Sequence, residues 1–343
     1  MQQATVRARR YVADMTRRPS LKPVSWRPVP PTGAAAPAPL PGLRLLHAPG
    51  RGPEDVLVVD DEIYTGVEDG RILRLSRSGD RVDRVADTGG RPLGIEAYPD
   101  GRLLVCDAER GLLLVDPASG EIETLVEVGG PESLRVCNNA AVAADGTIYF
   151  SDSSQRFPLE FWTADVLEHS GTGRLLRRTP GGSVDVLITG LQFANGVALA
   201  TDDSFVVVAQ TGSYELTRHW LSGPDAGTTD VFVAGLPAFP DNLARGSDGL
   251  IWIAMASPRK ALLDGPAARI PWLRSAIWVL PEALHPKPAR LVWVRAVDDE
   301  GQIVHDFCGT HDEFFMVTGV REQDGEVHLG SLESRSVATF RVP

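Results

Sequence analysis

The chain has 343 residues and a formal net charge of −11 at pH 7, which disfavours binding to nucleic acid or anionic lipid because both attract basic surfaces. Its three cysteines are widely spaced and form no CxxC pair, so we interpret them as structural thiols and expect a cytoplasmic protein. No uninterrupted apolar run is long enough to span a bilayer, and the N-terminus lacks the apolar segment of a secretory signal.

Residues 1–42 are predicted to be an arm outside the main fold. Five arginines lie among the first twenty residues, and residues 22–42 are rich in proline and alanine. This composition favours an extended, polyproline-like backbone that cannot build a core by itself. Trp26 is the residue that we expect to anchor the arm on the rest of the molecule.

From Leu43 onward the sequence is typical of many short antiparallel strands. Asp-Gly turns recur at 69–70, 100–101, 145–146, 248–249 and 324–325, and most are flanked by short runs rich in Val, Ile and Leu. An Asp-Gly pair between such runs is a strong hairpin signal, because both residues tolerate the positive φ of a tight turn.

The spacing of these units predicts an all-β, six-bladed propeller over residues 43–343. A propeller blade takes about 40–50 residues. One reference position per unit recurs at intervals of 40, 44, 57, 46 and 77 residues, namely Glu54, Gly94, Asn138, Asn195, Asp241 and Thr318. The two long intervals contain insertions, at 156–171 and 257–288. Residues 43–47 are expected to complete the last blade and close the ring. A β-sandwich or two smaller β domains is the alternative.

Four of the reference positions carry oxygen donors. The innermost strand of each blade lines the central channel, so the residues just before these strands face each other at one mouth of it. Glu54, Asn138, Asn195 and Asp241 would therefore form a ring of two carboxylates and two amides. Hard oxygen ligands without Cys or His favour Ca²⁺ over zinc or copper. Taken singly, each residue is also compatible with an ordinary turn or a surface acid.

Further residues are candidates for a substrate pocket at the same mouth. We expect the two insertions to cap it, with apolar side chains that either line a pocket or only pack the insertions onto the propeller. These are Phe157, Phe161, Trp162, Leu263 and Trp272. His305 and His311 flank the entry to the last blade, and Thr318 is the reference position of that blade. His305 and Thr318 are added to this pocket, although a structural or surface role is the alternative for His305.

From about Leu43 to the C-terminus the chain resembles the regucalcin/gluconolactonase superfamily of six-bladed propellers. It is most similar to the strictosidine synthase-like branch, which includes the adipocyte plasma membrane-associated protein. The motifs that carry the resemblance are GPEDV (52–56), EDGRILRL (68–75), RPLGIE (91–96), DGTIYFSDSS (145–154), GRLLR (173–177), FANGVAL (193–199), FPDNLA (239–244) and VREQDGEVHLGSL (320–332).

The resemblance implies one calcium ion, held by Glu54, Asn138, Asn195 and Asp241. It implies that the neighbouring Asn139 and Asn242 support these ligands or replace them. Many members of the superfamily hydrolyse lactones, esters or phosphotriesters.

Three positions depart from patterns within the superfamily. Leu93 stands where paraoxonases have a histidine, and Val136 stands where gluconolactonases have an arginine. Thr318 stands where strictosidine synthases have their catalytic glutamate, which disfavours the Pictet–Spengler reaction.

Three functions are consistent with these features. The first is calcium-dependent hydrolysis of a small-molecule lactone or ester, with the metal as Lewis acid and Asp241 as nucleophile or general base. The second is a propeller that binds a small molecule or a protein around a structural calcium. The third is a biosynthetic enzyme of condensation or cyclisation. The sequence determines neither the substrate nor the oligomeric state.

Overall fold

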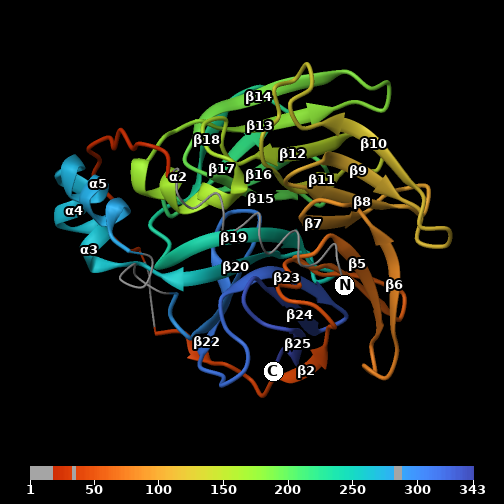
Figure 1. Ribbon diagram of the computed structural model, residues 1–343. Coiled ribbons are helices and arrows are strands. Elements are labelled where there is room, and N and C mark those ends of the chain that lie inside the picture. The colour runs from red at the N-terminus through yellow and green to blue at the C-terminus, as the bar shows by residue number, and fades with distance from the viewer. Residues whose placement is uncertain (1–17, 33–35, 282–287) are drawn as a thin grey trace.

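The computed structural model describes residues 18–32, 36–281 and 288–343. It confirms the predicted six-bladed propeller, because six antiparallel sheets surround one axis (Figure 1). The strands β7, β11, β15, β19 and β23 lie nearest the centre in that view, each as the first strand of its blade.

The strands of the first three blades follow one another directly in the sequence. The first blade contains β3 (Leu57–Val59), β4 (Glu62–Gly66), β5 (Arg71–Ser76) and β6 (Val82–Asp87). The second contains β7 (Pro92–Ala97), β8 (Leu103–Asp107), β9 (Gly111–Val115) and β10 (Ile122–Glu127). The third contains β11 (Cys137–Val142), β12 (Ile148–Asp152), β13 (Gly173–Arg178) and β14 (Val184–Leu191).

The last three blades include the two strands contributed by the N-terminal part of the chain. The fourth contains β15 (Ala194–Leu199), β16 (Phe205–Gln210), β17 (Glu215–Trp220) and β18 (Thr229–Val233). The fifth contains β19 (Ala238–Arg245), β20 (Ile251–Pro258), β21 (Val292–Val297), β22 (Ile303–Gly309) and β1 (Ala38–Pro39). The sixth contains β23 (Val317–Gln323), β24 (Glu326–Ser331), β25 (Ser336–Arg341) and β2 (Arg44–His47).

The ring closes as predicted, because β2 pairs antiparallel with the C-terminal strand β25 over Arg44–Thr339 to His47–Ser336. This pairing covers an edge that would otherwise expose unpaired backbone groups. β1 adds a feature that the sequence did not predict, since it pairs parallel with β22 and extends the fifth blade to five strands.

Apolar residues of neighbouring blades form the core. Six clusters of buried side chains lie between adjacent blades, one at each junction. Burial of side chains on both faces of each sheet explains why strands such as FVVVAQ (205–210) are apolar throughout rather than alternating.

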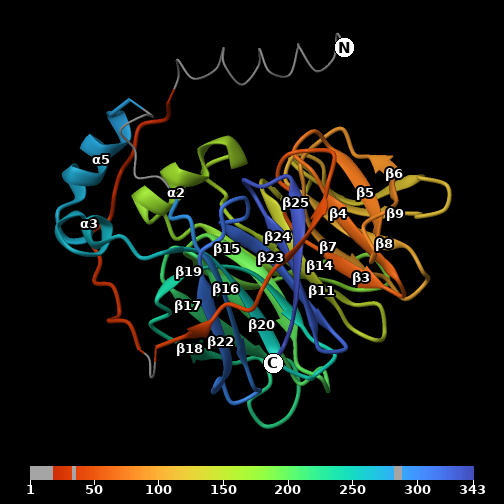
Figure 2. The same ribbon diagram turned by 90° about the horizontal axis from the view of Figure 1, so that it is seen from below.

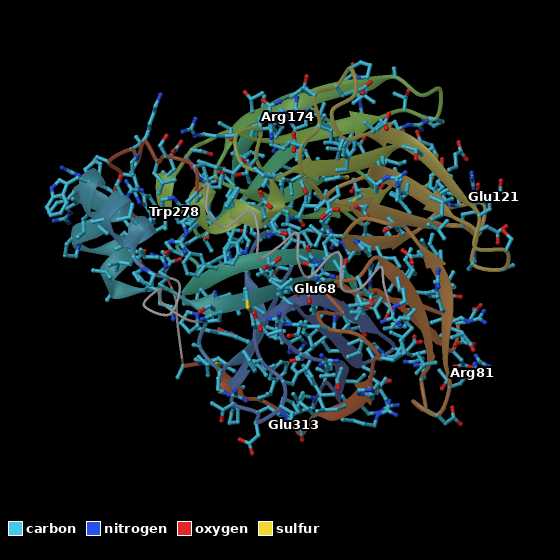
Figure 3. The ribbon with its side chains drawn as sticks, viewed as in Figure 1. Glu68, Arg81, Glu121, Arg174, Trp278 and Glu313 are labelled. Atoms are coloured by element: carbon cyan, nitrogen blue, oxygen red, sulfur yellow. The ribbon has the colours of Figure 1, made fainter. Side chains whose placement is uncertain are left out.

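The outer strands carry charged pairs, in contrast to the apolar side chains between the blades. Arg74–Asp83, Arg177–Asp185 and Arg218–Asp230 each join the third strand of a blade to its fourth. Figure 3 shows Arg81 and Glu121 at the same periphery. Such exposed pairs contribute little stability, but charge on an edge strand discourages pairing with another sheet.

The two insertions form a helical cap at one side of the propeller (Figure 1). The first contains a 3₁₀ turn (η1, Leu159–Phe161) and α2 (Trp162–Glu168). The second contains α3 (Ala261–Asp264), α4 (Pro266–Arg269) and α5 (Pro271–Val279). They share an apolar core that includes Phe157, Leu167, Ile277 and Trp278.

The arm binds across this cap, and in Figure 2 its red trace runs past α5 and α3 towards β22. Its backbone pairs with the cap through Val24 N to Glu168 O and Trp26 N to Ala268 O, both at 3.0 Å. The indole of Trp26 stacks on His169 at a ring distance of 4.1 Å, which gives it the anchoring place predicted from the sequence.

Candidate metal centre at the channel mouth

A two-residue bulge at the start of the inner strand builds the ring. In β7, β11, β15, β19 and β23 the pairing register skips residues 93–94, 138–139, 195–196, 241–242 and 318–319, so two residues oppose one on the next strand. Such bulges bend the strand and redirect side chains, often beside functional sites. In the first blade, residues 54–55 occupy the same place before β3. The register also shows that Leu93, not Gly94, is equivalent to Glu54.

Contacts are recorded among three of the four predicted ligands, and Asn138 occupies the equivalent bulge position of the third blade. Asp241 acts electrostatically on the carboxyl group of Glu54, and the Asn195 amide lies beside the carboxyl group of Asp241. Glu54, Asn138 and Asn195 are 3–4% exposed, whereas Asp241 remains partly accessible. Asp241 is therefore the ring residue that a molecule entering the mouth can reach most easily.

Neighbouring hydroxyl groups orient the two ring amides. Asn138 Nδ2 donates to Ser153 Oγ at 2.9 Å, and Asn195 Nδ2 donates to Thr211 Oγ1 at 3.1 Å. The amide oxygens of both asparagines are buried and have no partner among the described residues. An unsatisfied buried acceptor costs about 1–3 kcal/mol, and a cation ligand would satisfy both oxygens at once.

The carboxyl groups of the ring also favour a cation. Burial, followed by Asp241 and Asp55, raises the pKa of Glu54 well above its usual range. Burial, together with Asp55, raises the pKa of Asp241 to about 7, against the lowering effect of the Asn195 amide. Both carboxyl groups resist ionisation because their surroundings are poorly hydrated and contain other acids, and a divalent cation would remove this resistance.

A second layer supports the ring and alternates polar side chains with glycine. Asp55, Asn139 and Asn242 alternate with Gly94, Gly196 and Gly319 at the second bulge position of successive blades. A Cβ on Gly94 would lie 2.7 Å from the Asn139 Cα, and one on Gly319 would lie 2.5 Å from the Asp55 Cα. The glycines therefore provide the room in which the neighbouring polar residues sit.

Hydrogen bonds connect this second layer to the ring. Asn242 Nδ2 donates to Glu54 Oε2 and Asn139 Nδ2 donates to Asp55 Oδ2, each at 3.2 Å. Val197 N donates to Asn139 Oδ1 at 2.8 Å. Asn139 and Asn242 thus support the ring. Asp55 belongs to the same layer and was not predicted from the sequence, although it follows Glu54 as Asn139 follows Asn138.

The two remaining positions of the ring carry no free oxygen donor. Thr318 Oγ1 donates to the backbone oxygen of Glu54 at 2.8 Å, so it fixes a ring residue instead of lining a pocket. Leu93 packs with Val136 and Leu159 in a small apolar cluster that joins the second blade to the cap.

Both insertions leave the propeller at the end where the ring lies. The last residue of β12, Asp152, pairs with Cys137, and the last residue of β20, Pro258, pairs with Ala238. Among the candidate pocket residues, the indole of Trp162 lies 6.5 Å from the aromatic ring of Phe193, which precedes β15. Phe157 is buried in the cap core, and Phe161 packs edge-on to Trp278, so both stabilise the cap.

The structure corrects the assignment of Trp272 and His305 to the pocket. Trp272 is 68% exposed, because α5 turns Arg274, Ile277 and Trp278 inward and Trp272 outward. Because prolines flank this short helix, the sequence pattern did not show which of its residues face the core. His305 lies on the outer strand β22 and stacks on Trp252, near the end of the fifth blade that is remote from the ring.

The donor set of the ring fits a hard cation. Two carboxylates and two amide oxygens match the ligands of Ca²⁺ and leave places for water in a shell of six to eight oxygens. Among the described residues there is no group of three or more His, Cys, Asp or Glu that could hold a metal, so any site here depends on the amides.

Comparison with known proteins places the chain in a family. The strictosidine synthase model matches residues 138–224, and the N-terminal model of strictosidine synthase-like proteins matches residues 39–75. The adipocyte plasma membrane-associated protein of Salmo salar is 35% identical over 312 residues, which cover 82% of this chain and 74% of that protein. The chain belongs to the strictosidine synthase-like family. Strictosidine synthase-like 10 of Arabidopsis thaliana is 32% identical over 327 residues, or 85% of this chain and 86% of that protein.

Solved structures share the fold of this strictosidine synthase-like protein. A gluconolactonase from Xanthomonas campestris superimposes with a TM-score of 0.64 over 95% of this chain and 99% of its own, at 19% identity. The calcium-binding protein regucalcin from Agrobacterium tumefaciens gives a TM-score of 0.63 over 90% and 95%, at 15% identity. In the described part of this chain, no helix has the length and apolar character to cross a membrane.

Proposed function

We propose that this strictosidine synthase-like propeller is a calcium-dependent hydrolase of a lactone or ester. The observation that carries the proposal is the pair of buried, unpartnered amide oxygens of Asn138 and Asn195, at positions of their blades equivalent to those of Glu54 and Asp241. This set of donors has the composition of a calcium site. Two structural neighbours, a gluconolactonase and a calcium-binding protein, are consistent with it.

The residues have distinct roles in this proposal. Glu54, Asn138, Asn195 and Asp241 would hold the ion, and a bound Ca²⁺ would polarise the substrate carbonyl. Asp241 is partly accessible, so its carboxylate would accept a proton from the attacking water or attack the carbonyl itself. Glu54 is buried and held by Asn242, which restricts it to metal binding. Leu93 and Val136 are buried in an apolar cluster, so neither gives the mouth a polar group of the kind that a sugar-binding site would need.

The proposal is tested by measuring metal, stability and turnover on one preparation. Elemental analysis should find one calcium per chain, and EDTA should lower the melting temperature. Because the ion binds only the folded state, saturation at 100 times Kd should add about 2.7 kcal/mol of stability. A panel of aryl esters and lactones should then be hydrolysed with calcium and not with EDTA.

Each outcome separates the candidate functions. Calcium binding without hydrolysis of any ester or lactone would favour a propeller that binds a ligand around a structural ion. Hydrolysis that is unchanged in EDTA, with no calcium in the purified protein, would overturn the metal-dependent mechanism.

A further inference from the structure

The outer face of α5 is an apolar surface that faces solvent. Trp272 and Val279 lie seven residues apart, which places them on one side of the helix, and they are 68% and 74% exposed. Ser275 and Ala276 lie between them on the same side and are half-buried. Contiguous apolar surface often marks a site of interaction, whereas scattered apolar side chains do not.

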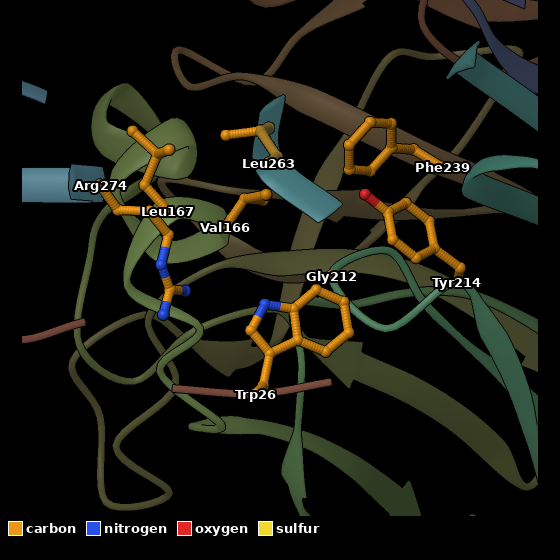
Figure 4. A pocket seen from close by; sticks show the side chains of 8 residues that line it. All are labelled: Trp26, Val166, Leu167, Gly212, Tyr214, Phe239, Leu263 and Arg274. Atoms are coloured by element: carbon orange, nitrogen blue, oxygen red, sulfur yellow. The ribbon is translucent and has the colours of Figure 1, made fainter. Parts of the chain in front are cut away.

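This side of the cap carries little charge. Of the exposed residues at positions 261–281, a stretch that lies wholly within the described chain, only Arg269 is charged. The charged residue of α5 itself, Arg274, is buried, and Figure 4 shows its side chain inside the cap, where it lines a pocket with Trp26 and Leu167. The outer face of α5 therefore offers apolar contact and no ion pair.

The arm already covers the adjoining side of α5. Trp278 Nε1 donates to Pro19 O at 2.8 Å. Arg18, the first described residue, donates from Nη1 to Trp278 O at 2.7 Å and to Leu280 O at 2.8 Å, and its guanidinium group lies 5.2 Å from the centre of the Trp278 ring. Residues 1–17 therefore join the cap at the C-terminal end of α5, next to Val279.

The sequence of residues 1–17 predicts an amphipathic helix. Ala4, Ala8, Tyr11 and Met15 recur at intervals of four, three and four residues, so a helix would carry them on one face. The arginines at positions 7, 9, 10 and 17 fall outside this face. Pro19 would end the helix at or before Arg18, because the residue before a proline disfavours helical backbone.

We propose that residues 1–17 form a helix that packs along the outer face of α5, with its apolar face against Trp272 and Val279. At 1.5 Å per residue, the nine residues of α5 extend about 14 Å and a helix of residues 1–17 extends about 25 Å, so the segment spans this face. The covalent link at Arg18 keeps the segment beside α5 at a high effective concentration, so docking needs no second molecule. This inference concerns the cap and does not depend on calcium or on hydrolysis at the ring.

The test is hydrogen–deuterium exchange of the full chain, followed by mass spectrometry in peptides from residues 5–16. A helix of about 12–15 residues is marginal in water by itself, so backbone exchange at least tenfold slower than in an unstructured peptide would report docking. Ala8→Asp places a charge on the apolar face and should return the segment to the unstructured rate. Ala13→Asp, the same change on the opposite face of the helix, should keep the slow exchange.

Trp272→Asp tests the other side of the proposed contact. Trp272 is exposed in the first turn of α5, where an acid is favourable to the helix, so the variant should fold. It should release residues 5–16 as Ala8→Asp does. Val186→Asp, at an exposed valine of the outer strand β14, is the control and should leave the slow exchange in place. Thermal unfolding of both variants checks that the propeller is intact.

Three results would overturn the proposal. One is exchange of residues 5–16 at the unstructured rate in the wild type. Another is an equal effect of Ala8→Asp and Ala13→Asp, or slow exchange that Trp272→Asp leaves unchanged. The third is slow exchange that depends on a second molecule. It would disappear on dilution if a second copy covered α5, and it would appear only with vesicles of phosphatidylcholine and phosphatidylserine if a lipid surface did.

Discussion

The ring and the cap lie side by side, but different interactions hold their side chains in place. In the ring, each residue occupies a bulge that recurs from blade to blade, and the second layer repeats a polar residue followed by glycine. In the cap, the helices are short and depend on the arm, whose Val24 and Trp26 pair with residues more than 140 positions away. Local repetition determines the ring, and long-range contacts determine the cap.

The largest expected effect comes from Asp241, the ring residue with access to solvent. Asp241→Asn keeps one coordinating oxygen and removes the proton acceptor, so hydrolysis at saturating calcium should fall about 10²–10⁴-fold. Asn195→Ala and Glu54→Gln should instead weaken calcium binding and recover part of their activity in excess calcium. The measurement is the rate on one responsive ester or lactone for all three variants. Full recovery of Asp241→Asn by calcium would reduce this residue to a plain ligand.

The next effect tests whether the glycines of the second layer are required for close approach of the blades. A Cβ on Gly196 would collide with the backbone of Asn242 and Leu243, neither of which can move without disturbing β19. Gly196→Ala should therefore cost about 3 kcal/mol or more in the free energy of unfolding. Gly181→Ala is the control, because its nearest neighbour is a side-chain atom at 3.8 Å. Similar urea midpoints for the two variants would show that the blades tolerate wider spacing.

The orientation of the ring amides gives a smaller and more specific effect. Thr211 Oγ1 accepts from Asn195 and donates to Pro240 O at 2.7 Å, so Thr211→Val should free the amide to rotate. Loss of such an outer contact typically weakens metal binding 10–100-fold. Thr217→Val, at another buried threonine of the same blade that contacts no ring ligand, should leave calcium affinity unchanged. An unchanged affinity in Thr211→Val would show that the hydroxyl does not position the amide.

This contrast explains what the sequence could and could not predict. The propeller, its closure by residues 43–47 and the equivalent bulge positions of Asn138, Asn195 and Asp241 follow from a repeat with a fixed position for polar residues. Asp55 follows the same rule, because it stands one residue after Glu54, as Asn139 and Asn242 stand after Asn138 and Asp241. The exposure of Trp272 and the burial of Arg274 were not predictable, because three short helices interrupted by prolines leave no continuous helical periodicity of apolar residues in the sequence.

The smallest effect concerns the pH dependence of stability that His169 contributes in the cap. Burial, and secondarily Arg274, lowers the pKa of His169 to about 4 from its ordinary value near 6.5. The unfolded chain then binds a proton between pH 6.5 and pH 4 that the folded chain excludes. The stabilising contribution is complete above pH 6.5 and is lost as the pH falls towards 4. It should amount to about 2 kcal/mol between pH 7.5 and pH 5, at about 1.4 kcal/mol per pKa unit.

Comparing His169→Asn with the wild type isolates this contribution, because asparagine tolerates the left-handed backbone at this position and carries no titrating group. Loss of the stack on Trp26 should lower stability equally at all pH values. The contribution of His169 is therefore measured by the slope of stability against pH. Urea unfolding at pH 5 and pH 7.5 should show a stability difference about 2 kcal/mol smaller in the variant. His47→Asn, at an exposed histidine of β2, should keep the wild-type slope. If His169→Asn also keeps the wild-type slope of stability against pH, water reaches His169 and the arm does not seal the cap.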